Sequence, residues 1–159
     1  MLPSDRRWHF LGDDVRGAHL SGLVQPALGF YGDDFTGSTD AMEALAVGGV
    51  DTLLFLRTPD VAEIDAARSR YAAVGIAGIS RSKDPSWMID KLPEPYLALK
   101  RLGAPLIHYK VCSTFDSSPS VGNIGTARAG DWAKTRRPTS IAVPILPTLG
   151  DESNVEQTL

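Results

Sequence analysis

The chain has 159 residues, of which 16 are basic, 19 are acidic and 43% are hydrophobic, and its net charge is −3. This length suits one domain with a sizeable core, and the composition is that of a globular protein. Because the basic residues are scattered and the balance is acidic, nothing indicates a nucleic-acid partner. The single cysteine, Cys112, excludes an internal disulfide and fits a reducing compartment.

No apolar run approaches the roughly 20 residues that cross a bilayer, and the start, MLPSDRRWHFLGDD, is too charged for a secretory signal. We therefore expect a cytoplasmic protein without a membrane partner. Residues 1–26 have no sustained hydrophobic period and are expected to be an N-terminal extension. Residues 151–159 are equally polar and aperiodic, which leaves residues 27–150 as one domain.

From residue 27 onward, short apolar runs alternate with runs of helical spacing, the pattern of βα units around a parallel sheet. The expected helices are 39–47, 60–68 and 85–102, the last with a break near Pro93 and Pro95. The expected strands are 28–31, 52–56, 72–79, 106–112 and 140–146, the last interrupted by Pro144 and so placed at an edge or a strand end. The predicted fold is α/β, a Rossmann-like, three-layer arrangement with an open, mostly parallel sheet of about five strands and flanking helices.

Polar clusters follow three of these strands directly. Asp33 and Asp34 follow the first, residues 80–82 follow the third, and residues 110–118 follow the fourth. In an open parallel sheet the carboxyl ends of the strands share one edge, and ligands bind in the crevice there. The three clusters are therefore expected to form one site.

The adjacent aspartates admit two interpretations. Two carboxylates at the end of a buried strand repel each other and lose hydration, so each pKa should rise unless a cation, a donor or a hydroxyl compensates. In the structural interpretation the stretch is only a strand-to-helix turn, with Ser38 or Thr39 as N-cap. In the functional one, Gly37 allows close backbone approach and one aspartate takes a proton from a sugar hydroxyl while its neighbour orients it or holds a hydrated cation.

The stretch KVCSTFDSSPSVGNIG begins at Lys110, at a strand end where burial is costly without an anionic partner. A lysine grouped with hydroxyls suits a carboxylate and a polyol, although a polar loop that caps a helix explains the same residues. It is not a P-loop, because GxxxxGK[ST] is absent. Arg81 is weak evidence alone, but on the same edge it is a candidate for bidentate capture of a carboxylate.

In order and spacing, GFYGDDFTGSTDAMEALA, GIAGISRS and HYKVCSTFDSSPSVGNIG resemble the amino-terminal substrate-binding domain of the four-carbon acid sugar kinase family, over about residues 27–126. The resemblance implies ATP-dependent phosphorylation of the C4 hydroxyl of threonate, erythronate or their oxo forms, with Mg²⁺. It implies that Asp34 contacts the substrate and that Asp33 belongs to the same acidic motif. Both are catalytic candidates, and our working assignment makes Asp34 the base and Asp33 its electrostatic neighbour. The substrate-binding residues expected on this basis are Asp34, Thr36, Arg81, Lys110, Val111, Cys112, Ser113, Thr114 and Asp116.

Members of that family are more than twice as long, and a carboxy-terminal domain carries their ATP-binding glycine-rich loop. We therefore expect a truncated member or one half of a split enzyme, inactive alone, with the ATP and Mg²⁺ site on the missing domain. Its candidate partners are a four-carbon sugar acid, a separately encoded nucleotide-binding half and a second copy of the chain. The alternative function is a non-catalytic remnant or sensor that binds a sugar acid. An aspartyl-nucleophile phosphatase is disfavoured, because its aspartates are separated by one residue.

Overall fold

The computed structural model describes residues 9–10, 26–129 and 139–142. Six parallel strands form one sheet in the order β1-β3-β4-β2-β5-β6. The strands are β1 (His9–Phe10), β2 (Leu28–Gly32), β3 (Thr52–Phe55), β4 (Ala73–Ala77), β5 (Leu106–Lys110) and β6 (Thr139–Ala142). The expected parallel α/β sheet is confirmed, with one strand more than predicted, because part of the N-terminal segment pairs with β3.

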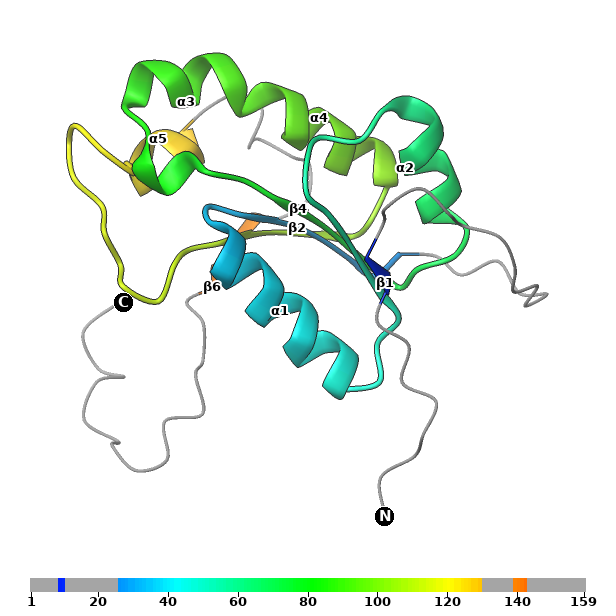
Figure 1. Cartoon of the computed structure of the whole chain (residues 1–159). Helices are drawn as coiled ribbons and strands as arrows, with labels where there is room; N and C mark the ends of the chain where they lie inside the picture. Colours follow the sequence, from blue (N-terminus) through cyan, green and yellow to red (C-terminus); the bar gives the residue numbers. More distant parts are fainter. Residues whose placement is uncertain (1–8, 11–25, 130–138, 143–159) are drawn as a thin grey trace, which may run out of the picture.

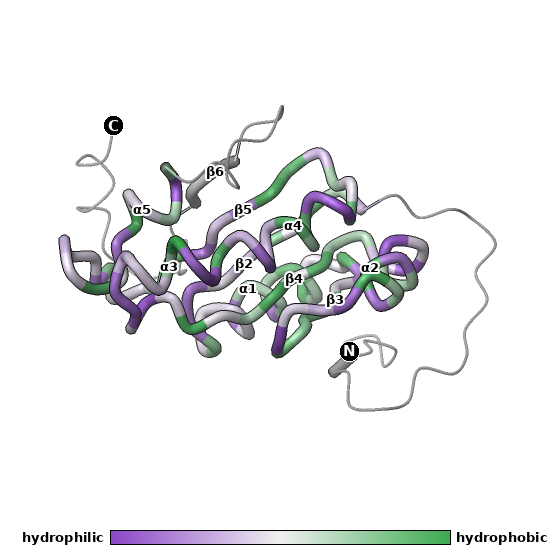
Figure 2. Tube along the Cα trace, turned by 90° about the horizontal axis from the view of Figure 1, so that it is seen from above, coloured by the Kyte–Doolittle hydropathy of each residue, from purple (hydrophilic) through white to green (hydrophobic). Residues whose placement is uncertain are grey.

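The helices cover both faces of this sheet, as Figure 1 shows: α1 lies on one face, and α2, α3 and α4 lie on the other. Seen from above, hydrophilic residues are prominent in the loops near α3 and α5 (Figure 2). The predicted break near Pro93 separates α3 from α4. The helices are α1 (Phe35–Val47), α2 (Val61–Arg68), α3 (Pro85–Lys91), α4 (Pro93–Leu102) and α5 (Ile124–Ala129), with a 3₁₀ turn, η1 (Ser80–Ser82), after β4.

The central strand β2 buries side chains on both of its faces. Phe30 packs in the cluster with Met42 of α1, whereas its neighbour Tyr31 packs in the larger cluster on the opposite face. This two-sided burial explains why the strand is a continuous apolar run. Gly75 pairs with Phe30 across the sheet, and a Cβ there would lie 2.2 Å from the phenyl ring. The sheet therefore needs a glycine at position 75.

Helix α1 begins four residues earlier than predicted, at Phe35, and its N-cap is Asp34 in place of Ser38 or Thr39. Asp34 has an extended backbone, and its Oδ1 accepts the Gly37 N–H at 2.7 Å. The Ser38 hydroxyl donates instead to the Asp34 carbonyl at 2.5 Å. An aspartate is one of the strongest N-caps, so its early position in the motif moves the helix start forward.

Some predictions fall partly or wholly outside the described residues. Of the predicted strand 140–146, only the part within β6 is described, and Pro144 is not. The tail 151–159 also lies outside. Among the helices that the structure describes, none combines the length and apolar character that a membrane crossing requires.

Candidate functional site

A pocket of about 370 Å³ lies at the carboxyl edge of the sheet, where β4, β2 and β5 end side by side. All three predicted polar clusters contribute to it, because β2 lies between the other two strands. Its lining residues are Asp33, Asp34, Phe35, Ile79, Arg81, Ser82, Asp116 and Val121. The structure confirms that these three segments, which lie far apart in the sequence, come together at one edge of the sheet.

Main-chain hydrogen bonds hold the three segments together at Asp33. Its N–H donates to the Lys110 carbonyl at 3.0 Å, and its carbonyl accepts the Arg81 N–H at 3.0 Å. The Cys112 N–H also donates to its carboxylate. The residue at the end of β2 therefore joins the start of η1 to the end of β5, and backbone geometry sets the separation of the side chains around the pocket.

The Asp33 side chain is almost completely buried. The residue is 2% exposed, and within the described part of the chain its Oδ1 has no hydrogen-bond partner. Burial, followed by the nearby charge of Asp34, raises its pKa to about 6, although the Cys112 N–H and the charge of Lys110 oppose the shift. A buried acceptor without a partner is uncommon in folded proteins.

Asp34 behaves differently from its neighbour. Partial burial, the largest single influence, raises its pKa, but hydrogen bonds from the Cys112 thiol and the Gly37 N–H together with Arg81 outweigh burial and lower the pKa below its usual value. Asp34 is therefore ionised at neutral pH. Two carboxyls whose environments move their pKa values apart are typical of acid–base sites.

Gly37 lies where a side chain would disturb this arrangement. A Cβ there would be 2.6 Å from Asp34 Oδ1 and 3.0 Å from Lys110 Nζ. Lys110 is 5% exposed, and its ammonium donates to the Val111 carbonyl at 2.9 Å. The lysine thus lies beside the first turn of α1 and is not among the residues that line the pocket.

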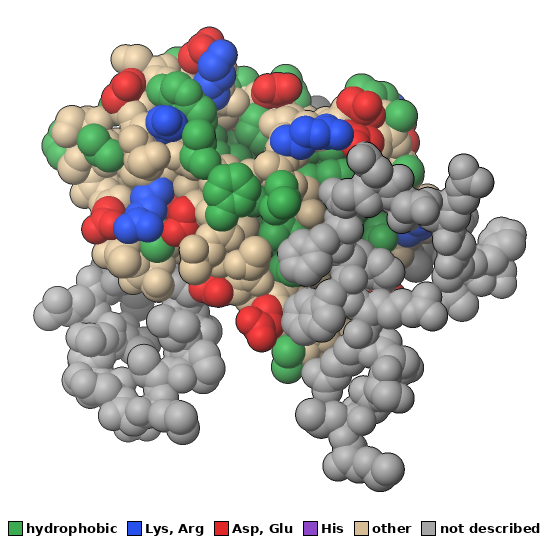
Figure 3. Space-filling model, in the orientation of Figure 1, with side chains coloured by type: hydrophobic (Ala, Val, Ile, Leu, Met, Phe, Trp, Pro, Cys, Tyr) green, Lys and Arg blue, Asp and Glu red, His purple; other side chains and the backbone are tan. Residues whose placement is uncertain are grey.

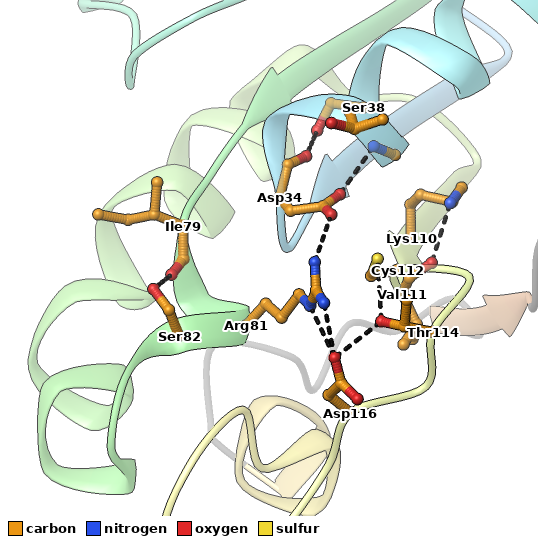
Figure 4. A network of polar contacts seen from close by, with 12 residues as sticks. Asp34, Ser38, Ile79, Arg81, Ser82, Lys110, Val111, Cys112, Thr114 and Asp116 are labelled. Atoms are coloured by element: carbon orange, nitrogen blue, oxygen red, sulfur yellow. Dashed lines mark hydrogen bonds and ion pairs between the residues drawn. The ribbon is translucent and has the colours of Figure 1, made fainter.

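Arg81 joins two carboxylates across the pocket (Figure 4). Its Nη1 donates to Asp34 Oδ2 at 3.2 Å, while its Nε and Nη2 donate to Asp116 Oδ2 at 3.2 and 2.6 Å. Thr114 Oγ1 lies 2.8 Å from the same Asp116 oxygen and 3.3 Å from Cys112 Sγ. The guanidinium that we expected to hold a substrate carboxylate is occupied by side chains of the protein itself.

The loop that carries Asp116 packs against η1 through Gly122. Gly122 has a φ of 60°, and a Cβ there would lie 2.5 Å from the Arg81 carbonyl oxygen and 2.8 Å from the Asp116 carbonyl oxygen. Its N–H donates to the Lys83 carbonyl at 2.9 Å. Phe115, directly before Asp116, also has a left-handed backbone, with a φ of 56°, which is uncommon for a bulky residue. The loop is therefore bent at both sides of Asp116.

Tyrosine and serine hydroxyls lie next to Asp33. Tyr109 OH and Ser80 Oγ are 3.2 Å apart and buried, and the rings of Tyr31 and Tyr109 stack with centroids 5.8 Å apart. Burial raises the pKa of Tyr109, and the charge of Asp33 adds to that effect.

The predicted substrate-binding residues divide into three groups. Asp34, Arg81 and Asp116 line the pocket. Lys110, Val111 and Cys112 are buried beside it, and Thr36, Ser113 and Thr114 are exposed.

Sequence reasoning missed the apolar part of the pocket. Phe35, Ile79 and Val121 line it although each is between 41% and 46% exposed. The available signal was an apolar residue close in sequence to each polar cluster, since Phe35 follows Asp34, Ile79 precedes residues 80–82 and Val121 follows residues 110–118. Figure 3 shows, in the orientation of Figure 1, apolar side chains next to pairs of oppositely charged ones. The site is thus partly apolar, as ligand pockets usually are.

The residues that the structure describes do not fit a bound metal. Within those residues, no three His, Cys, Asp or Glu side chains are placed to hold an ion. The two pocket carboxylates next to Arg81 are already neutralised by it.

Comparison with known proteins gives the family. Residues 28–150 match the model of the sugar-binding N-terminal domain. The chain belongs to this family. The predicted resemblance to the amino-terminal domain of sugar-acid kinases is confirmed, because relatives that match this chain are 3-oxo-isoapionate and 3-oxo-tetronate kinases.

Two of these relatives and one solved structure show how far the similarity extends. The domain is 55% identical to the 3-oxo-isoapionate kinase of Paraburkholderia graminis over 63% of this chain and 21% of that protein. It is 36% identical to the 3-oxo-tetronate kinase of Pseudomonas savastanoi pv. phaseolicola over 80% of this chain and 29% of that protein. A Salmonella typhimurium LT2 structure described as a putative tRNA synthase has a TM-score of 0.57 and 31% identity, over 65% of this chain and 23% of that one. The chain thus spans less than a third of each.

Proposed function

We propose that the domain binds a 3-oxo sugar acid and presents its terminal hydroxyl for phosphorylation by ATP. The family description and the names of the relatives support this proposal, since both kinds of relative are named for 3-oxo acids. ATP as phosphoryl donor supports a cytoplasmic location for the proposed reaction.

The observation that carries the proposal is the pair of aspartates with opposed pKa values. Asp33 has a buried, unpartnered oxygen and a pKa of about 6, so at neutral pH it is largely ionised and still basic enough to take a hydroxyl proton. Asp34 is held by the α1 N-terminus and by Arg81. These contacts support assigning the base to Asp33 and the positioning role to Asp34, the reverse of the roles expected from sequence.

Other residues then have defined tasks. Arg81 binds the carboxylate of the acid, because its planar fork suits a carboxylate better than an ammonium does. The apolar residues Phe35, Ile79 and Val121 exclude water around the bound carbon chain. Lys110 holds the end of β5 against α1, and its charge favours the ionised form of Asp33.

The nucleotide and Mg²⁺ belong to a second domain in this proposal. ATP would supply the phosphoryl group, and such reactions depend on positioning and on neutralising the charge of the phosphates. The described residues offer no metal cluster for that purpose. The second domain is either a further part of the same protein or a separately encoded partner.

Thermal unfolding of the chain with four-carbon sugar acids tests the binding step. 3-Oxo-tetronate, threonate or erythronate at about 100 times its Kd should stabilise the chain by about 2.7 kcal/mol, and the neutral tetritols should stabilise it far less. Arg81→Lys should weaken acid binding although it keeps the charge. Arg101→Lys is the matched control. Arg101 lies outside the pocket, and its Nε and Nη2 donate to the Asp65 carboxylate at 3.0 and 2.6 Å. No stabilisation by any of these acids would refute the proposed function.

A further inference from the structure

The fork of Arg81 that suits a carboxylate is already filled by one. Nε and Nη2, the two donors on one edge of the guanidinium, both point at Asp116 Oδ2. Thr114 donates to the same oxygen at 2.8 Å. Figure 4 shows this contact extending from the loop after β5 toward η1, with Asp34 on the opposite side of Arg81. A substrate carboxylate and Asp116 cannot use the same two donors at once.

We infer that Asp116 is an internal competitor for Arg81, which the carboxylate of an incoming acid displaces, and that it thereby sets the affinity of the pocket for acids. This inference rests on the proposed function, since it needs an acid to bind at Arg81. Asp116 acts as a specificity-determining residue in this scheme. A ligand without a carboxylate leaves it in place.

The charges around the pocket indicate that an incoming acid displaces Asp116 from Arg81 and does not bind in addition to it. Asp33, Asp34 and Asp116 line the pocket with a single cation, Arg81. A further carboxylate entering this set meets like charges at short range, where Coulomb repulsion is appreciable. When Asp116 leaves, the substrate carboxylate takes its place, and the number of negative charges facing Arg81 is unchanged.

The structure of the loop allows the Asp116 side chain to leave Arg81 at a low free-energy cost. Residues 113–117 are all exposed, and the Asp116 side chain is 61% exposed. Phe115 holds a left-handed backbone directly before it, a conformation that bulky side chains disfavour. The loop packs against η1 at Gly122, after the exposed residues. Segments with few buried contacts open most readily. Residues 113–115 and the Asp116 side chain can therefore move while the Asp116 carbonyl stays against Gly122 and Ser117 Oγ keeps the Ile124 N–H.

Calorimetric titration of the full chain with threonate and with threitol tests the inference. Asp116→Asn removes the competing charge but keeps the shape, and should tighten threonate binding by about two- to fivefold, the range expected for an exposed ion pair. Thr114→Val, which removes one donor to Asp116, should tighten it by a smaller factor. Asp65→Asn is the control, because Asp65 accepts from Nε and Nη2 of Arg101 in the same way outside the pocket, and it should change nothing. Threitol binding should be the same in all four proteins.

Hydrogen exchange provides a second measurement that does not depend on the variants. In the wild-type chain, saturating threonate should speed amide exchange across residues 113–117, and threitol should not. Equal threonate affinity in the wild type and Asp116→Asn, or a slowing of exchange in this loop, would overturn the inference while leaving the proposed function intact. An absence of binding of both threonate and 3-oxo-tetronate by every protein would overturn both.

Discussion

Asp33 and Asp34 are neighbours in the chain, yet the pKa of the first is raised to about 6 and the pKa of the second is lowered. Asp33 directly follows the buried strand β2, and its main chain is hydrogen-bonded to Lys110 of β5 and to Arg81 of η1. Its carboxyl group is therefore buried. Asp34 is the N-cap of α1 and meets Arg81 at the pocket. The two residues therefore respond differently to pH and to substitution.

Replacing Asp33 by Asn should stabilise the chain at neutral pH. A raised carboxyl pKa means that the folded state binds more protons than the unfolded state between about pH 4 and pH 6, so this group lowers stability as pH rises through that window. Above pH 6 the cost is fully present, and Asp33→Asn should remove on the order of 2 kcal/mol of it. Chemical unfolding from pH 4 to pH 8 measures the difference from the wild type. If the difference in unfolding free energy between Asp33→Asn and the wild type were the same at pH 4 and at pH 8, the raised pKa would be contradicted.

Replacing Asp34 by Ala should affect both folding and binding. It removes the N-cap of α1 and should lower the free energy of unfolding by about 1 kcal/mol. The matched control is Asp84→Ala, because Asp84 caps α3 by accepting the Trp87 N–H at 2.9 Å. Both variants should lose similar stability, but only Asp34→Ala should weaken sugar-acid binding, since Asp34 positions the Arg81 guanidinium at the pocket. Unchanged acid binding in both variants would reduce Asp34 to a helix cap.

Gly122→Ala should damage the site more than an ordinary glycine substitution. Gly122 and Gly103 both have left-handed backbones, with φ of 60° and 76°. At Gly103 the nearest atom to a Cβ is 3.5 Å away, so alanine should cost only the left-handed conformation, about 1 to 2 kcal/mol. At Gly122 the Cβ also meets two carbonyl oxygens, and the loss should be about 2 to 4 kcal/mol. Denaturant unfolding compares them, and equal losses would show that the loop does not pack on η1 as described.

Turnover separates the roles of the two aspartates once a nucleotide domain is supplied. A chimera in which residues 27–126 replace the corresponding part of the Paraburkholderia graminis kinase is suited to this test, because the two proteins are 55% identical over 100 residues. Asp33→Asn should reduce kcat by about two to four orders of magnitude with little change in acid binding, as expected for loss of a general base. Asp34→Asn should mainly raise KM. The opposite pattern would return the base to Asp34.

Local features of the sequence were sufficient for much of the fold. The alternation of apolar runs with helical spacing predicted the parallel sheet, because buried strands and amphipathic helices impose these periods on neighbouring residues. Pro93 predicted the break between α3 and α4 for an equally local reason, since proline cannot continue a helix without losing a hydrogen bond. The position of the polar clusters after strands also predicted where the pocket would be.

Tertiary structure alone decided how the side chains in that pocket are used. That Lys110 is buried against α1, that Arg81 is held by Asp116, and that Asp33 keeps an unpartnered oxygen each depend on residues far away in the chain. The pairing of β1 with β3 is equally non-local. Residue types show which groups can ionise or donate, but burial and the distances between partners set their pKa values and their pairing. Those quantities exist only once the strands have come together.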